Sequence, residues 1–110
     1  MAKLERTIHG EFSQILYMIV NGVLDSSASA TLEDATDYSY GDARCSVRVF
    51  ERYSFFGGNR VSMNVTLFQA QRGTVHISAI TSGGSQAVFF KVNTLGEETF
   101  LDTLDRILKN

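Results

Sequence analysis

The sequence contains no proline, no tryptophan and a single cysteine, and it has no long hydrophobic run. Average usage of about 5% would give roughly five prolines in a chain of this length, so turns must be made by Gly, Asn, Asp and Ser. A proline-rich linker or docking segment is therefore excluded. The single cysteine excludes an internal disulfide, and it also excludes a cysteine-based metal site within one chain.

The longest apolar window, residues 15–20, is about a third of the roughly 20 residues that span a membrane. The first residues carry charges and lack the apolar stretch of a signal peptide. We therefore expect a cytoplasmic protein without a membrane partner. A net charge of −2 and a pI near 5.6 lack the basic excess of a nucleic-acid-binding surface, so no nucleic-acid partner is expected. The 110 residues fit one domain, residues 1–110.

Apolar and polar residues alternate with period two from Ala43 to Ile80, which indicates strands with one buried and one solvated face. We expect three antiparallel strands, with a three-residue hairpin loop at residues 56–58 between the first two. This loop pairs Val49 with Val65, and a second loop around residues 71–73 pairs Leu67 with Ile77. In this register the apolar residues share the buried face, and the first strand's polar residues occupy the solvated face: Arg44, Ser46, Arg48 and Arg52.

The remaining elements follow from the same kind of periodicity. Residues 3–9 indicate a short first strand, and helical spacing from Glu11 indicates a helix that closes at residues 25–27. Residues 28–40 indicate a strand whose acidic middle, residues 33–37, favours an edge position or a bulge. Residues 87–93 indicate a last strand. Thr94 and Glu97 then form a capping box for a helix with Arg106 and Lys109 in its last turn.

The expected order is β-α-β-β-β-β-β-α. Each helix has one apolar stripe and the sheet has one apolar face. The expected fold class is therefore α+β, a curved antiparallel sheet of five to six strands with two helices packed on one face. This order resembles the TBP-like or helix-grip fold, in which a sheet wraps around a C-terminal helix. TATA-box-binding protein half-repeats and the START or pollen-allergen ligand carriers are examples of that fold.

Several local strings also resemble a family of small uncharacterised bacterial proteins. The strings are Arg52-Tyr53-Ser54, Gly57-Gly58-Asn59-Arg60-Val61-Ser62, Thr81-Ser82-Gly83-Gly84-Ser85-Gln86-Ala87 and Gly96-Glu97-Glu98. This second resemblance covers nearly the whole chain. It implies no known activity, ligand or catalytic residue.

The arginine-bearing face of the expected sheet is the first candidate site. It combines cations with scattered apolar residues, and such residues favour burial against a partner. It would bind an anion or a partner, and the simplest partner is a second copy of the chain. The alternative is a solvated outer face whose cross-strand pairs only stabilise the sheet. The candidate binding residues are Arg44, Arg48, Phe50, Arg52, Phe68, His76 and Ile80.

A pocket between the sheet and the C-terminal helix is the second candidate site. Its expected lining is Val49, Glu51, Val65, Phe90, Phe100 and Leu104. Glu51 is the one acid in the apolar register and could orient a ligand or act as a base. Alternatively, Glu51 lies at a strand end or bulge and reaches water.

The remaining polar residues predict no chemistry. His9 and His76 lack metal-ligand spacing, so no metal site and no cofactor are expected. Cys45 is expected to be a buried, unreactive thiol. Ser46 near His76 is the only nucleophile–base combination, and it would lie on an open face that does not exclude water. No catalytic residue is assigned.

The sequence does not by itself name a function. We expect a non-enzymatic binding or interaction module that associates with a second copy through its sheet. The alternative is a carrier of helix-grip type for a small apolar ligand, and an anionic ligand is also compatible with the arginines. An enzyme ranks third.

Overall fold

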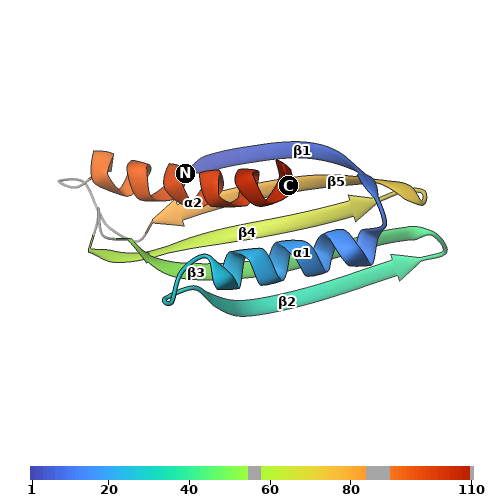
Figure 1. The fold of residues 1–110 in the computed structure, drawn as a ribbon, viewed down its shortest axis with the longest axis horizontal. Coiled ribbons are helices and arrows are strands. Elements are labelled where there is room, and N and C mark those ends of the chain that lie inside the picture. Colours follow the sequence, from blue (N-terminus) through green and yellow to red (C-terminus); the bar gives the residue numbers. More distant parts are fainter. Residues whose placement is uncertain (55–57, 84–89, 110) are drawn as a thin grey trace.

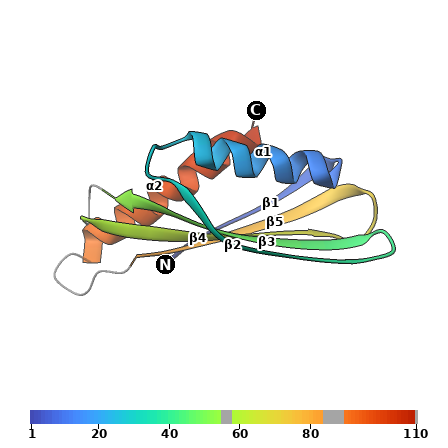
Figure 2. The same ribbon diagram turned by 90° about the horizontal axis from the view of Figure 1, so that it is seen from below.

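The computed structural model describes residues 1–54, 58–83 and 90–109, and for residues 90–95 it describes the backbone alone. The protein has two layers, a five-stranded sheet and two helices on one of its faces (Figure 1 and Figure 2). In chain order the elements are β1 (Ala2–Gly10), α1 (Phe12–Asp25), β2 (Thr31–Tyr40), β3 (Ala43–Ser54), β4 (Asn59–Gln69), β5 (Gly73–Gly83) and α2 (Phe90–Lys109). The expected fold class is confirmed.

The strands lie in the order β1-β5-β4-β3-β2, and every neighbouring pair is antiparallel. β2 is an edge strand, and its pairing with β3 shifts between Leu32 and Asp34. The extra residue, Glu33, forms the irregularity that the acidic middle of this segment predicted. β2 begins at Thr31, three residues later than expected from the alternation.

α1 begins where the change to helical spacing predicted. The Glu11 carboxylate accepts hydrogen bonds from the backbone N–H groups of Ser13 and Gln14 at 2.7 and 3.1 Å, which caps the first turn. At its other end α1 approaches α2 closely, because a Cβ on Gly22 would lie 2.8 Å from Cδ1 of Ile107. The buried residues of α1 are Phe12, Ile15, Ile19 and Val23.

α2 begins earlier than predicted. Phe90 is its first residue, so residues 90–93 are helical and Thr94 lies inside the helix rather than at its N-cap. The rest of the expected last strand falls on residues 84–89, outside the described residues. Arg106 and Lys109 lie in the last turn, as expected.

The register between β3 and β4 differs by one residue from the prediction. Phe50 pairs with Met63 and Arg48 pairs with Val65, whereas we expected Val49 opposite Val65. The predicted pairing of β4 with β5 is confirmed, since Leu67 faces Ile77. Consequently the even-numbered residues of β3 face the helices, and the odd-numbered ones face away.

This register buries the largest apolar side chain of β3. Phe50 is completely buried in the core, and Val47 and Val49 remain half-buried on the opposite face. The arginines beside Phe50 need not bury their charges, because an arginine can pack its aliphatic stem on apolar surface and extend its guanidinium group toward water. The core contains Phe12, Ile15, Ile19, Val23, Phe50, Val61, Met63, Val65, Leu67, Val75, Ile77, Ala79, Phe100, Leu101 and Leu104.

Candidate functional site

Both helices lie on one face of the sheet, and no described helix covers the other face, here called the outward face (Figure 2). In its three central strands β3, β4 and β5, all fully described, the only charged side chains on this face are Glu51 and Arg60. These two pair with each other at 3.0 Å. Serine, threonine and asparagine fill most remaining outward positions of β4 and β5. The centre of the outward face, on β3, β4 and β5, therefore has no net charge and many hydrogen-bonding groups.

Large aromatic and apolar side chains stand on the same face. Tyr38 is 72% exposed, and Phe68 and Ile80 are 44% and 43% exposed. Near one corner of the sheet an apolar groove of about 320 Å³ is lined by Tyr38, Tyr40, Cys45 and Phe68, among others. Cys45 is thus half-buried in an outward groove rather than in the core, which corrects the expectation for it. Exposed aromatic groups gathered on one face are typical of an interaction surface.

The first candidate site is divided by the corrected register. Phe68, His76 and Ile80 lie on the outward face, where the Phe68 and His76 rings stack with centroids 6.5 Å apart. The others lie on the helix-covered face: Arg44, Arg48, Phe50 and Arg52. The expectation that all seven share one solvated face is wrong, because pairing Phe50 with Met63 turns the even positions of β3 inward.

Arg48 belongs to a polar cluster between β3 and the edge strand β2. Its Nη2 lies 3.0 Å from Oδ1 of Asp37, and the Ser46 hydroxyl donates to the same oxygen at 2.5 Å. The Ser46 hydrogen bond, followed by the hydrogen bond and charge of Arg48, holds the pKa of Asp37 below its usual value. Ser46 is buried, so this bond also satisfies a hydroxyl that water does not reach.

Ser46→Ala is expected to raise the pKa of Asp37, because it removes the largest cause that lowers it. A carboxylate whose folded pKa is depressed stabilises the protein above its unfolded pKa of about 3.9. This stabilisation is lost as the pH falls through the folded pKa. The Asp37-linked part of the stability loss in Ser46→Ala should therefore be present at neutral pH and vanish in acid. NMR titration of the carboxyl groups measures the pKa of Asp37, and urea unfolding at neutral and at acidic pH measures the stability loss. Ser62→Ala, on the outward face, is the control, and an unshifted Asp37 in Ser46→Ala would contradict the assignment.

Arg52 links β3 to α2. Its guanidinium carbon lies 4.4 Å from the centroid of the Phe100 ring, and its Nη1 donates to the Thr103 hydroxyl at 3.1 Å. Burial lowers the pKa of Arg52, and the nearby charge of Arg106 lowers it further. No carboxylate of the described residues lies within 4 Å of this guanidinium. Arg52 therefore acts here as a packing and hydrogen-bonding group between the layers.

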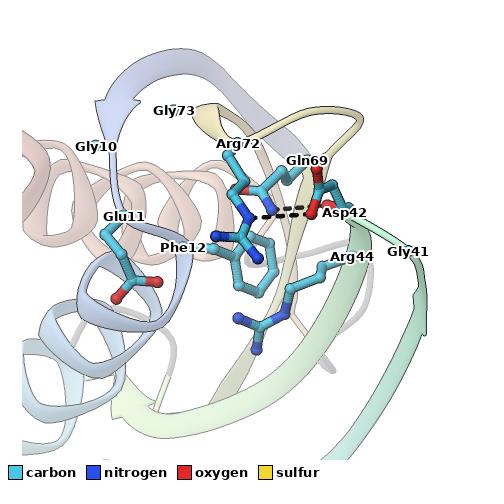
Figure 3. Close-up of a pocket in the computed structure, with 9 residues that line it drawn as sticks. All are labelled: Gly10, Glu11, Phe12, Gly41, Asp42, Arg44, Gln69, Arg72 and Gly73. Atoms are coloured by element: carbon cyan, nitrogen blue, oxygen red, sulfur yellow. Dashed lines mark hydrogen bonds and ion pairs between the residues drawn. The ribbon is translucent and has the colours of Figure 1, made fainter.

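Arg44 lies at the other end of β3, beside an open cleft of about 480 Å³ (Figure 3). We call it the end cleft. Three segments far apart in the sequence form its walls: the β1–α1 junction, the β2–β3 turn and the β4–β5 turn. Its lining residues are Gly10, Glu11, Phe12, Gly41, Asp42, Arg44, Gln69, Arg72 and Gly73.

The second candidate site is not assembled either. Val49 and Glu51 lie on the outward face, where Glu51 is held by Arg60, so Glu51 does not point into a pocket. Val65, Phe100 and Leu104 lie in the core and have no exposed surface. The side chain of Phe90 lies outside the described residues. A cavity large enough for water would expose surface on its lining, so none adjoins those three core side chains.

The other chemical candidates are also separated. Ser46 faces the helices and His76 faces outward, so the nucleophile–base combination does not form. Within residues 1–54, 58–83 and 96–109, no group of three or more His, Cys, Asp or Glu side chains could hold a metal ion. Neither helix, over its described residues, is long and apolar enough to cross a membrane.

The fold defines a two-layer α+β domain with both helices on one face of the sheet. Within that class, the chain belongs to the Family of unknown function (DUF6054), which matches residues 1–110. No curated protein sequence matches it. Among solved structures, it is similar to the di-domain ARO/CYC StfQ from the steffimycin biosynthetic pathway, with a TM-score of 0.48 and 5% identity. That match covers 98% of this chain and 45% of the other.

Proposed function

We propose that this protein is a binding module that forms a homodimer by packing two outward faces together. The observation that carries the proposal is the neutral centre of that face. Its only charged pair in β3, β4 and β5, Glu51 with Arg60, is already compensated. Two identical charged faces would repel across a two-fold axis, and the centre of this face, on β3, β4 and β5, carries no net charge.

The size of the face also suits a second copy. With strands about 4.8 Å apart and outward stretches of about ten residues rising about 3.3 Å each, the face measures roughly 20 by 35 Å. That is roughly 700 Å², close to the approximately 800 Å² that each partner contributes to a standard interface. Tyr38 and Phe68 provide aromatic anchors, which commonly carry much of the binding energy at interfaces.

The apolar-ligand carrier receives no such support from the described residues. A carrier needs space between the sheet and α2, and Val65, Phe100 and Leu104 are fully packed there. The dimer is therefore the function that the geometry favours.

Light scattering tests the dimer directly. The wild-type protein should have twice the chain mass of 12.2 kDa, and Tyr38→Asp or Phe68→Asp should reduce it to one chain mass. Each substitution places a charge on the outward face, which a dimer would have to desolvate without a partner. Both side chains are exposed in the single chain, so circular dichroism should remain unchanged.

Tyr17→Asp is the matched control. Tyr17 is 73% exposed, like Tyr38 at 72%, but it lies on α1 away from the outward face. This variant should keep the wild-type mass. A wild-type mass of one chain at every concentration, or equal dissociation by Tyr17→Asp, would refute the proposal.

A further inference from the structure

In the end cleft the acidic side chains have partners, whereas one of the two arginines has no acidic partner among the described residues. Four charged side chains line it, and both acids are already engaged. Glu11 accepts from two N–H groups of the first turn of α1, and Asp42 lies 3.0 Å from Nε of Arg72. Because the Glu11 carboxylate caps α1, the N–H groups of Ser13 and Gln14 at the helix terminus are not available to a ligand.

Arg44 is the arginine of the end cleft that has no carboxylate partner in the described part of the chain. No carboxylate of the described residues lies within 4 Å of its guanidinium group. Asp37 accepts a hydrogen bond from Ser46 and forms an ion pair with Arg48, and these contacts lower its pKa more than the charge of Arg44 does. The one side-chain hydrogen bond from Arg44 to a described residue goes from Nη1 to the Ser13 hydroxyl at 2.8 Å. A guanidinium has five N–H donors, so most of those on Arg44 have no partner among the described residues.

The surroundings hold Arg44 in a fixed position. Its guanidinium carbon lies 4.3 Å from the centroid of the Phe12 ring, and Phe12 is 1% exposed. The aromatic face orients the planar group, so a ligand would find the donors already arranged. Gln69, which is 4% exposed, donates from Nε2 to the backbone carbonyl of Asp42 at 2.8 Å and braces the opposite turn.

Arg72 stands at the rim of the same cleft. Its side chain is 84% exposed, and its ion pair with Asp42 uses Nε, which leaves both terminal nitrogens for a ligand. Figure 3 shows the guanidinium groups of Arg44 and Arg72 directed into the space between the three wall segments. Neither Gly41 nor Gly73 has a neighbouring atom within 4 Å of where a Cβ would stand, so this side of the cleft is open.

We propose that the end cleft binds a small organic anion through its carboxylate or phosphate group, with Arg44 as the main contact and Arg72 at the rim. A planar guanidinium fits both groups, because it can donate two parallel hydrogen bonds to their oxygens. The cleft volume of about 480 Å³ lies within the range of about 300–1,000 Å³ typical of small-molecule sites. This site goes beyond the dimer, since it uses residues that are not part of the outward face.

NMR titration with two probes, succinate and inorganic phosphate, tests the site at constant ionic strength. We expect the Nε–Hε signal of Arg44 and the amides of Gly41 and Gly73 to shift with saturation, at a dissociation constant on the order of millimolar. Saturation by succinate alone identifies a carboxylate ligand, saturation by phosphate alone a phosphate ligand, and saturation by both the shared oxyanion chemistry. Each of these results supports the site.

Arginine variants separate binding from general screening. Arg44→Gln should weaken the saturating probe by about tenfold or more, and Arg44→Lys should weaken it less, because it keeps the charge but loses the planar fork. Lys109→Gln, at an exposed cation on the last turn of α2 outside both the cleft and the outward face, should bind like wild type. Arg72→Gln alters an exposed side chain and should weaken binding severalfold in a folded protein, which keeps the test valid even if Arg44→Gln does not fold. Shifts that rise without saturation, or that are equal in all variants, would overturn the proposal.

Discussion

Phe50→Ala is expected to lower the free energy of unfolding by about 3–5 kcal/mol, whereas Val49→Ala next to it should cost less than about 1 kcal/mol. Phe50 is completely buried beneath the helices, and its truncation leaves a cavity that the surrounding side chains fill only in part. Val49 lies half-buried on the outward face, where water replaces the lost methyl groups.

Urea unfolding followed by circular dichroism measures both variants, at a concentration low enough to keep association from contributing. The slope of the free energy against urea should be unchanged in Val49→Ala, so its midpoint reports stability alone. A reversed order, with Val49→Ala costing more than Phe50→Ala, would restore the register expected from the alternation and contradict the pairing of Phe50 with Met63.

This comparison shows where sequence reasoning succeeded. The elements from β1 to β5, the edge position of β2 and its irregularity near Glu33 follow from local periodicity and turn residues. The pairing of Leu67 with Ile77 also follows, because both strands alternate cleanly and admit one register. The alternation in β3 favours neither face as clearly.

In β3 each choice of face buries something polar. One choice buries Glu51, and the other places three arginines under the helices. The expectation treated arginine as a residue that must face water, but Arg44 and Arg52 end on the aromatic rings of Phe12 and Phe100. A carboxylate on a short stem cannot escape in this way, so Glu51 was the available signal for the correct register.

The end cleft could not have been derived from local patterns. Its walls come from residues 10–12, 41–44 and 69–73, and only the sheet topology brings them to one end. The sequence placed Arg44 among candidate anion-binding residues, and that role stays a prediction. It did not indicate Arg72 or Gln69, because Arg72 lies in an ordinary turn and Gln69 lies at the end of the strand before it.

Glu97 should be the polar residue of α2 on which stability depends most. It is 5% exposed, and its Oε2 accepts from the backbone N–H of Gly83 at 2.7 Å. Its Oε1 lies 3.0 Å from the amino group of Met1. One carboxylate therefore connects α2 to the end of β5 and to the start of the chain. The sequence assigned this residue to a capping box, and the structure gives it this role between the layers instead.

Glu97→Ala is expected to cost about 2 kcal/mol, since hydrogen bonds to charged groups contribute about 1.5–3 kcal/mol and the Gly83 N–H would lose its acceptor. Glu97→Gln keeps an acceptor for Gly83 and should cost less. The adjacent Glu98 is exposed and supplies the matched control, because Glu98→Ala should stay within about 0.5 kcal/mol of wild type. Urea unfolding gives the three values, and hydrogen exchange at the Gly83 amide should accelerate in Glu97→Ala alone. Equal costs for Glu97→Ala and Glu98→Ala would show that the carboxylate does not connect α2 to β5.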